Sequence, residues 1–413
     1  MRTAPPSADG RKKSILFLNH NWRARATYFR NFNLARVLAA RGWDATVMTT
    51  SPQRALRVVE SMDRGVRVIE MPWFLSNLRY GATGCCPYDI FRRMLKMTGR
   101  RYDVYFVSDH LPNVSLPYWV AKKIHPDALF VSDWADLFTD GGVHAHLNHS
   151  FTKPIYQISH RLEYGIKRST DLGTTISRPL LEKLIEQVGV PAERTLYLPS
   201  GCDFEVKMPP PRDRARKLLG LPEDTLIIGR TTSTDYMFAA EIPAYLNLWK
   251  RVKELTNQDP LFYFIGPCKQ ESYPQIFRSG FPVRNTGRVP SAEVATHLAA
   301  CDLFVMIEDD KPFNHFRSPT RLNDYLTVSR PLICNSVGDH IPMLKQHKAC
   351  VVYDDFAAHN AALDQILTDA AERESMGKRI RALAESDLKN WTALGKKLDD
   401  FLREKGRAKL ERA

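Results

Sequence analysis

Residues 318–334 read SPTRLNDYLTVSRPLIC. This stretch follows the apolar run 303–307 after one loop, and it ends in a second apolar run at 331–334. Both runs are short enough to be buried strands, whereas the segment between them suits a helix. The order strand, loop, helix, turn, strand is typical of a parallel α/β domain.

The start of the predicted helix carries groups suited to an anion. Pro319 can open the helix because the first helical position needs no backbone N–H. Ser318, Thr320 and Arg321 then lie where unpaired N–H groups and the positive helix end favour phosphate, and the Arg321 guanidinium can bind it bidentately. Asp324, one turn further on, is within reach of sugar hydroxyls. The stretch predicts a diphosphate-sugar site at the carboxyl edge of a sheet; the alternative is an ordinary crossover helix.

Length and composition predict two domains without a membrane span. The chain has 413 residues, too many for one ordinary domain. It contains no run of roughly 20 apolar residues, which a membrane-spanning helix requires. Residues 1–13 are polar and predict a disordered leader. The seven cysteines are scattered without a CxxC pair, which favours a reducing compartment and argues against structural zinc.

The charge balance favours anionic partners. Lys and Arg number 59 against 46 Asp and Glu, a net charge of +13. Such a balance suits nucleotide-sugars, nucleic acid or an acidic membrane surface. We expect no nucleic-acid partner, because the sequence lacks zinc-finger spacing, RNP-like strands and arginine tracts interleaved with aromatic residues.

Alternating apolar runs and helical periods extend through both halves of the chain. In the first half, a helix is predicted at 28–40 and strands at 14–18, 45–49, 66–69, 104–107, 128–131, 172–175 and 196–198. In the second half, strands are predicted at 225–229, 261–266, 303–307, 331–334 and 350–352. We therefore expect an α/β fold of two Rossmann-like, doubly wound domains.

Domain boundaries follow from changes in composition. Residues 206–223 contain Pro209-Pro210-Pro211 and a charged run, and they are the predicted linker. The domains are then 14–205, which would bind the acceptor, and 224–385, which would bind the donor. A final helical segment, 386–413, is predicted to cross back to the first domain.

Five segments carry a resemblance to a known family: RNFNLARVLAARGWDATVMTT (30–50), ISRP (176–179) with LYLPSGCD (196–203), IGR (228–230), NTGRVP (285–290) with AACDLFV (299–305), and SPTRLNDYLTVSRP (318–331). In order and spacing they resemble the GT-B glycosyltransferases, in particular the large retaining family 4, or group 1, that uses nucleotide-sugars. The resemblance implies two domains facing across a cleft and a hexosyltransferase-type, metal-independent enzyme without a cofactor. It departs where that family has two glutamates, because Phe316 replaces the first and Asp324 the second. A lysine expected shortly after Arg230 is also missing.

The resemblance implies roles for charged residues in both domains. Arg230 and Arg321 would stabilise the leaving diphosphate as catalytic cations. Glu308 would join the donor site, with Ser318, Pro319, Thr320 and Asp324. Asp133 and Asp136 follow a strand of the first domain and would orient or deprotonate the acceptor hydroxyl.

Further polar residues of the first domain are candidates for the acceptor site. These are Arg23, Arg25, Asp109, His110 and His144. For Arg23 and Arg25, a solvated surface is an equal alternative. Although His144 lies in a histidine-rich loop, we predict no metal site, because the spacing is weak evidence for one.

The expected function is transfer of a sugar from a nucleotide-sugar to a hydroxyl of a saccharide or lipid-linked precursor of cell-surface polysaccharide, with retention. The segment 73–97 mixes apolar and cationic residues that suit an acidic membrane surface, or else a packed helix. We expect a cytoplasmic protein, with peripheral attachment to the inner membrane face as an open alternative. A GT-B sugar-nucleotide epimerase and a catalytically degenerate sugar-binding or nucleotide-binding protein are the competing functions.

Overall fold

The computed structural model describes residues 11–23, 25–53, 56–73, 84–202, 204, 209–232, 237–278, 280–355 and 360–411. Most of the predicted leader, 1–13, lies outside the described residues. The chain divides into two compact units. Unit 1 comprises Met1–Pro199 and Trp391–Ala413, and unit 2 comprises Ser200–Asn390. Each unit has its own sheet and core.

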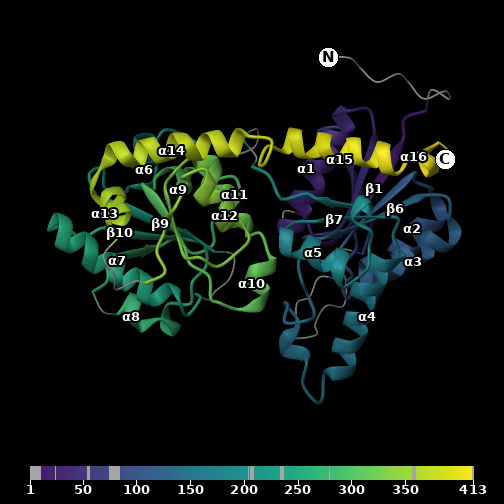
Figure 1. Cartoon of the computed structure of the whole chain (residues 1–413), viewed down its shortest axis with the longest axis horizontal. Helices are drawn as coiled ribbons and strands as arrows, with labels where there is room; N and C mark the ends of the chain where they lie inside the picture. The colour runs from purple at the N-terminus through teal and green to yellow at the C-terminus, as the bar shows by residue number, and fades with distance from the viewer. Residues whose placement is uncertain are drawn as a thin grey trace. The chain divides into compact units, whose positions relative to one another are not determined.

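Unit 1 alternates strands and helices along the chain (Figure 1). Its elements are β1 (Ser14–Trp22), α1 (Ala26–Ala40), β2 (Asp44–Thr50), β3 (Val59–Asp63), β4 (Val66–Met71), α2 (Pro87–Gly99), β5 (Val104–Ser108), α3 (Pro112–Ile124), β6 (Leu129–Trp134), α4 (Lys153–Ser169), β7 (Leu172–Thr175), α5 (Arg178–Glu186), β8 (Thr195–Tyr197), α15 (Trp391–Lys405) and α16 (Arg407–Leu410). Short 3-10 turns lie at Ala145–Leu147 and Ala192–Arg194.

The sheet of unit 1 has the order β3-β4-β2-β1-β5-β6-β7-β8. All pairings are parallel except that of β3 with β4. The sequence gives no clear strand signal at β3, because this edge strand is mostly exposed and polar. A tight turn joins β3 to β4 and determines their antiparallel pairing. Arg64 and Gly65 in this turn both have positive φ, which is the geometry of two-residue hairpins.

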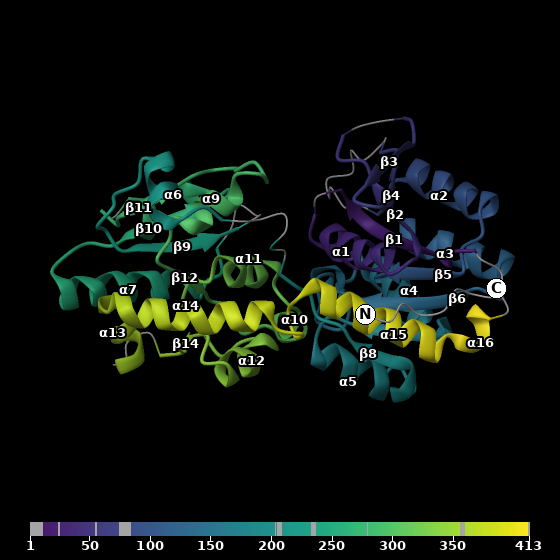
Figure 2. The ribbon, with the colours of Figure 1, turned by 90° about the horizontal axis from the view of Figure 1, so that it is seen from above.

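Alternate residues of the central strand enter two cores. Ile15 and Phe17 of β1 join the apolar core under α1 and α15, whereas Leu16 and Leu18 join the core under α2 and α3. Figure 2 shows α15 running along unit 1. A Cβ on Gly395 would lie 2.5 Å from the Val37 side chain, so α15 approaches α1 closely because this position has no side chain.

Unit 2 is a second α/β domain. Its elements are α6 (Arg212–Leu219), β9 (Ile227–Thr231), α7 (Glu241–Thr256), β10 (Leu261–Ile265), α8 (Pro274–Phe277), β11 (Val283–Asn285), α9 (Val294–Ala299), β12 (Leu303–Met306), α10 (Pro312–Phe316), α11 (Thr320–Val328), β13 (Leu332–Cys334), α12 (His340–Gln346), β14 (Val351–Val352), α13 (Ala361–Thr368) and α14 (Ala370–Glu385), with a 3-10 turn at Gln270–Ser272. All its strands pair in parallel, in the order β11-β10-β9-β12-β13-β14.

The fold class expected from the sequence is confirmed, since both units are doubly wound α/β domains. Unit 2 has the strand order of a Rossmann domain. Some boundaries differ. The predicted linker 206–223 contains α6, whose Ala215 is buried in the core of unit 2, so this prediction is wrong for 212–219. Pro319 is the N-cap of α11 rather than its first helical residue.

Candidate functional site

In unit 2 the strand order reverses between β9 and β12, and ligands of doubly wound sheets bind at the carboxyl ends of such strands. Arg230 lies near the carboxyl end of β9, and Glu308 follows β12. The N-terminus of α11 brings Arg321 to the same edge, where its Nη2 donates to Glu308 Oε1 at 2.7 Å. Three predicted donor residues therefore meet at one end of one sheet.

Arg321 belongs to a pair of arginines held by one buried carboxylate. Only 1% of the Glu308 side chain is exposed, and its Oε2 lies 3.4 Å from Nη2 of Arg317. The guanidinium carbons of Arg317 and Arg321 lie 5.7 and 5.5 Å from the Phe238 ring centre. Burial opposes the charged form of Arg321, but the carboxylates of Glu308 and Glu241 outweigh it and raise the pKa of this guanidinium.

The arginine pair has hydrogen-bonding capacity to spare. The Nε–H groups of Arg317 and Arg321 are buried and have no acceptor among the residues that the structure describes. Buried donors in folded proteins almost always have a partner. In the described part of the chain, the three arginines Arg230, Arg317 and Arg321 share only two carboxylates, Glu241 and Glu308, which leaves a net positive charge. These donors are suited to an anion with several oxygen atoms.

Arg230 is placed differently from Arg321. Its Nε and Nη2 donate to Glu241 Oε1 and Oε2, each at 2.9 Å, in a bidentate pair that is almost fully buried. Burial opposes the charge of Arg230, but Glu241 outweighs it and raises the pKa. The pair compensates the Arg230 charge, so Arg321 is the better placed of the two predicted catalytic cations.

The remaining predicted donor residues surround the start of α11. Thr320 is exposed, whereas Ser318 and Asp324 are half-buried. No side chain caps α11 at Pro319, and the Leu322 N–H donates to Pro319 O at 3.1 Å, so the Thr320 and Arg321 N–H groups are the donors of the first turn without an acceptor within the helix. Asp324 lies three residues after Arg321 and therefore shares its helix face. This arrangement agrees with a phosphate at the helix start and a hydroxyl one turn further on.

His340, at the start of α12, was not predicted from the sequence. It is buried, and neither ring nitrogen has a hydrogen-bond partner among the described residues. Burial, followed by the charges of Lys389, Arg321 and Arg317, lowers the pKa of His340 to about 3. Its imidazole is therefore neutral at pH 7, and it adds a buried donor and acceptor beside the arginine pair.

The depressed pKa of His340 predicts a loss of stability in acid. The unfolded chain binds a proton at this histidine below pH 6.5, whereas the folded chain does so only near pH 3. Stability should therefore fall as pH drops below 6.5. Between pH 7 and pH 5, H340Q should lose about 2 kcal/mol less unfolding free energy than the wild type, as measured by urea titration.

The exposed His149 provides the control for this prediction. H149Q removes no buried imidazole, so it should lose as much stability as the wild type over the same pH interval. Equal losses in H340Q and the wild type would show that His340 already binds a proton in the folded protein at pH 5.

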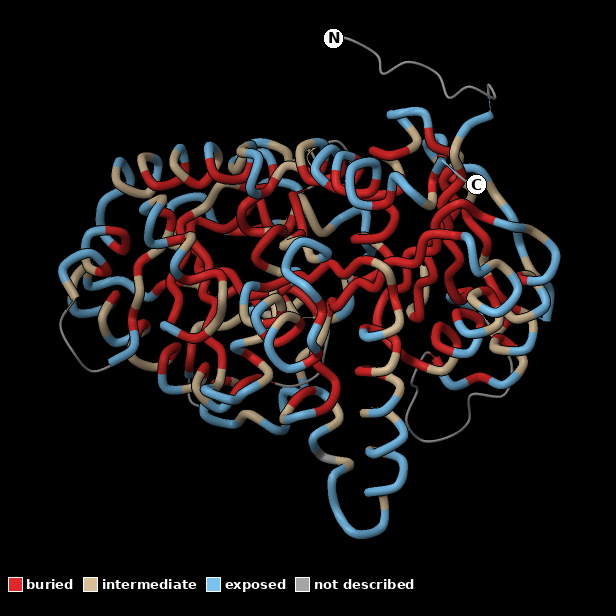
Figure 3. The backbone as a smooth tube through the Cα atoms, turned by 45° about the vertical axis from the view of Figure 1, so that its right-hand side comes forward, coloured by how far each residue is buried: buried red, intermediate tan, exposed pale blue. Residues whose placement is uncertain are grey.

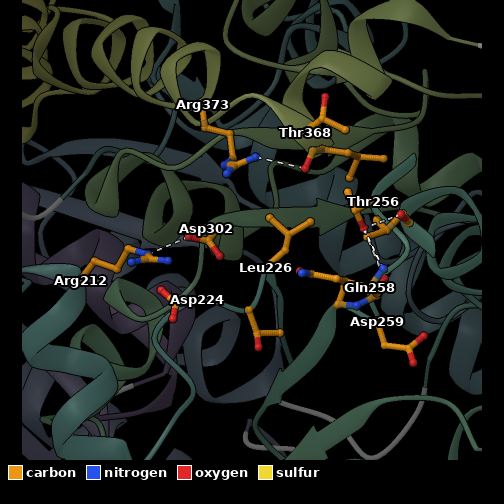
Figure 4. Close-up of a pocket in the computed structure, with 13 residues that line it drawn as sticks. Arg212, Asp224, Leu226, Thr256, Gln258, Asp259, Asp302, Thr368 and Arg373 are labelled. Carbon is orange, nitrogen blue, oxygen red and sulfur yellow. Dashed lines mark hydrogen bonds and ion pairs between the residues drawn. The ribbon is translucent and has the colours of Figure 1, made fainter. Parts of the chain in front are cut away.

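A separate cavity lies at the opposite edge of the unit 2 sheet (Figure 4). It has a volume of about 190 Å³, and its lining includes Leu226, Pro260 and Asp302, which precede β9, β10 and β12. The Nε of Arg212 donates to Asp302 Oδ1 at 2.7 Å in its wall. The cavity is thus at the amino edge, away from Arg321.

In unit 1 the strand order reverses between β1 and β5. His20 of β1 and Asp109, directly after β5, meet there, with His20 Nδ1 3.3 Å from Asp109 Oδ2. Asp109 has a φ of 63°, a strained conformation for a residue with a side chain. Burial, followed by the charges of Asp136 and Asp133, raises the pKa of Asp109 well above its ordinary value.

The two aspartates predicted to act on the acceptor have different surroundings. Asp133 is buried, and its oxygens accept from Nε and Nη2 of Arg30, both at 2.8 Å, and from Thr174 Oγ1 at 2.7 Å. Asp136 is half-buried, and its backbone N–H donates to Asp109 Oδ1 at 3.3 Å. Asp133 thus neutralises a buried arginine, which leaves Asp109 and Asp136 as the carboxylates better placed for an acceptor hydroxyl.

His110 and His144 are brought together by Ser159 of α4. Ser159 Oγ lies 2.8 Å from His110 Nε2 and 3.2 Å from His144 Nδ1. Burial lowers the pKa of His110 well below its usual value, and the charge of Lys167 adds to this effect. Three of the five predicted acceptor residues, Asp109, His110 and His144, therefore lie in one region of unit 1.

The other two predicted acceptor residues lie at the end of β1. Arg23 donates to Glu70 at 2.6 Å and to Asp63 at 3.2 Å, so the edge strand β3 and its neighbour β4 hold its guanidinium. Arg25 lies over the Trp22 ring, at 5.3 Å from the ring centre. The structure does not bring either residue into contact with Asp109.

Several residues of these two regions carry little or no signal in the sequence. Arg317 directly precedes Ser318, and this adjacency was the available signal. The sequence around Glu241 and His20 did not mark them as site residues. Glu241 pairs with Arg230 of another element, and His20 lies beside Asp109, which is distant in the chain. Lys167 of α4 is buried against the Trp134 ring, and burial lowers its pKa.

The described part of the chain contains no cluster of three metal-ligating side chains; His146, of the histidine-rich loop, has no described side chain. None of the helices that the structure describes has the length and apolar character needed to cross a bilayer. Residues 74–83, which belong to the predicted membrane-facing segment, lie outside the described residues.

Two family models match the chain. A glycosyl transferase 4-like domain matches residues 27–201, within unit 1 except at its last residues. A glycosyl transferase-like model matches residues 247–392, mostly in unit 2. No curated protein sequence matches the chain.

Solved structures match almost the full length. Sucrose-phosphate synthase from Thermosynechococcus elongatus has 17% identity and a TM-score of 0.70, covering 96% of this chain and 100% of its own. WaaG, a glycosyltransferase involved in lipopolysaccharide biosynthesis, has 16% identity and a TM-score of 0.65, covering 94% and 100%. HepE from Anabaena, in complex with UDP-glucose, has 14% identity and a TM-score of 0.64, covering 94% and 99%.

At such low identity these likenesses establish the fold alone. The family models add the activity class and match segments of both units, including the α11 stretch of unit 2. The chain belongs to the glycosyltransferases of the GT-B fold.

Proposed function

We propose that the chain transfers a hexosyl group from a nucleotide-sugar, bound by unit 2, to a hydroxyl group of a saccharide or lipid-linked acceptor, bound by unit 1. The acceptor would be a precursor of cell-surface polysaccharide, and the reaction would take place in the cytoplasm. Retention of the anomeric configuration is proposed from the resemblance to the retaining family.

The arginine pair is the observation that carries the donor assignment. Arg321 and Arg317 share Glu308, and their Nε–H groups lack acceptors among the described residues. A diphosphate would supply acceptor oxygens for these donors. It would also lie at the start of α11, where the helix dipole favours negative charge. The binding of UDP-glucose by HepE supports a nucleotide diphosphate donor.

The chemistry explains why cations suffice. When the bond between the anomeric carbon and the diphosphate breaks, the leaving oxygen gains negative charge. A fixed guanidinium beside that oxygen stabilises the transition state more than the ground state. Arg321 would provide this charge, so the reaction is proposed to need no metal ion. The Asp324 carboxylate would accept hydrogen bonds from hydroxyls of the ribose or donor sugar.

Unit 1 offers an acceptor site around Asp109. Its raised pKa makes this carboxyl group a stronger base once ionised, and half-buried Asp136 lies beside it. Either group would orient the acceptor hydroxyl or take its proton. His110 and His144 would form the neighbouring wall. The part played by WaaG in lipopolysaccharide biosynthesis supports a surface-polysaccharide acceptor.

A thermal-shift screen tests the donor assignment. The purified protein is heated with UDP-, GDP-, ADP-, dTDP- and CMP-sugars in buffer that contains EDTA. A ligand that binds only the folded protein stabilises it, by about 2.7 kcal/mol at a ligand concentration of a hundred times Kd. This stabilisation raises the midpoint temperature of unfolding. We expect one nucleotide class to raise it without metal.

The corresponding free nucleotide serves as the reference in this screen. A smaller shift with the nucleotide than with its sugar conjugate would show that the sugar is bound as well. If no nucleotide-sugar shifts the midpoint, or if the shift appears only after Mg²⁺ is added, the metal-free donor site is wrong.

A further inference from the structure

A helical arm projects from unit 1 (Figure 1). It comprises residues 141–162, which include the loop before α4 and the first half of that helix; we call it the α4 arm. Figure 3 shows its tip as an exposed segment that extends beyond the buried strands. Phe151 is 92% exposed, Ile155 59% and Ile158 58%.

Three exposed apolar side chains lie near the tip of the arm. Ile155 and Ile158 are three residues apart on α4 and therefore share a helix face, and Phe151 lies in the turn that leads into this helix. Single exposed apolar residues are common on protein surfaces, whereas a contiguous apolar face on a projecting element marks an interaction site.

The charge of the α4 arm indicates which surface it contacts. Residues 141–162 contain no aspartate or glutamate. Lys153 and Arg161 are both exposed. A helix whose projecting half has exposed apolar side chains, flanking cations and no acidic residues fits the interface of an anionic bilayer, where each cation near the surface adds electrostatic attraction. An acidic bilayer also complements the net charge of +13.

The base of the α4 arm is part of the proposed acceptor region. Ser159 of the arm contacts His110 and His144, as described above. Tyr156 Oη of the arm accepts from the Asp140 backbone N–H at 2.8 Å, which fixes the loop against the helix. An acceptor head group at this region would thus lie beside the element whose tip carries the apolar residues.

We propose that the α4 arm inserts its apolar tip, Phe151, Ile155 and Ile158, into the surface of an anionic lipid bilayer and so brings the acceptor region to a membrane-embedded, lipid-linked acceptor. This proposal rests on the proposed function for the identity of the acceptor, a lipid-linked precursor. The bilayer contact itself does not require the donor assignment.

A second exposed apolar surface, on α2, provides the matched control. Phe91 and Leu95 are 52% and 49% exposed there. This is the helix of the segment that the sequence suggested for a membrane surface. Its cation Lys96 is paired with Glu60 of β3 at 2.7 Å, so part of its charge is compensated. Residues 141–162 of the α4 arm contain no carboxylate side chain that could pair with Lys153 or Arg161.

The test is co-sedimentation with vesicles of phosphatidylcholine, with and without phosphatidylglycerol. We expect the wild-type chain to bind the anionic vesicles and to bind neutral vesicles weakly. F151S/I155S should lower the vesicle partition coefficient by on the order of tenfold or more, because the inserted apolar area is lost. K153E/R161E should lower it on anionic vesicles alone, and F91S/L95S should leave it unchanged.

Since the replaced side chains are exposed, all variants should keep the wild-type thermal midpoint and the same shift with nucleotide-sugar. Wild-type protein that fails to bind anionic vesicles, or F151S/I155S protein that binds like the wild type, would overturn the proposal. A third result would also overturn the proposal. If sedimentation velocity showed that the wild type is a dimer and F151S/I155S a monomer, the apolar tip of the α4 arm would contact a second copy of the chain instead of a bilayer. Failure of the donor assignment would appear separately, as a wild-type chain that binds vesicles but no nucleotide-sugar.

Discussion

Replacing Arg321 by alanine should abolish the thermal shift with nucleotide-sugar and lower kcat/KM by on the order of 10²- to 10³-fold. Its guanidinium is held 2.7 Å from Glu308 at the N-terminus of α11, where developing negative charge on the diphosphate would be stabilised. The variant also leaves Glu308 with one cation fewer, which disfavours an anionic ligand further. Initial rates with the nucleotide-sugar identified in the screen measure the effect.

R381A provides the matched control in the same unit. Arg381 of α14 is half-buried, its Nε lies 2.5 Å from Glu385, and its guanidinium carbon lies 4.2 Å from the Phe204 ring centre, so these contacts do not involve Glu308 or Arg317. R381A should keep both the shift and the activity. R321K should keep part of the affinity, because lysine retains the charge but loses the bidentate geometry. Wild-type activity in R321A would exclude Arg321 from the donor site.

Replacing Asp133 by asparagine should lower the free energy of unfolding by about 3–5 kcal/mol, because it leaves the buried Arg30 guanidinium without a counter-charge. Both carboxylate oxygens accept from Arg30 at 2.8 Å, and only 3% of the Arg30 side chain and none of the Asp133 side chain is exposed. Urea unfolding followed by circular dichroism measures the change.

The double variant R30M/D133L separates stability from catalysis. Replacing both charges by apolar groups of similar size removes the unpaired charge and should restore most of the stability. We expect this variant to regain folding and to keep acceptor-dependent turnover through Asp109 and Asp136. If D133N has the stability of the wild type but no turnover, Asp133 acts on the acceptor and its pairing with Arg30 is secondary.

The sequence was sufficient for the central strands and for one edge strand of each sheet, β8 and β14, but not for the opposite edges, β3 and β11. Central strands such as β1, β5 and β12 are continuous apolar runs, because both faces of a parallel sheet are covered by helices. β3 and β11 are edge strands with exposed positions, and their sequences lack that signal. The charged run before β9 looked like a linker, yet it forms α6, because Arg216 is neutralised by Asp302 at 2.6 Å.

The residues of the site could be listed from the sequence more readily than their roles. The location of Glu308 and Arg321 follows from strand order, because Glu308 follows the carboxyl end of β12 and Arg321 lies at the start of α11, the helix that leads into β13. The pairing of Arg30 with Asp133 joins residues 103 positions apart, which no local pattern reveals. Arg230 was predicted as a free cation because its partner Glu241 belongs to the next helix. Whether an arginine can bind a ligand therefore depends on the carboxylates that surround it in the fold, and residue type alone does not show this.

Hydrogen–deuterium exchange with and without the identified nucleotide-sugar would locate the donor site, because bound ligand slows the exchange of the backbone amides that it covers. We expect protection of peptides that span residues 307–323 of unit 2, at the Glu308 loop and the first turn of α11. Protection confined to unit 1, or to peptides around Leu226 and Arg373 at the opposite edge of the unit 2 sheet, would contradict this placement of the donor site.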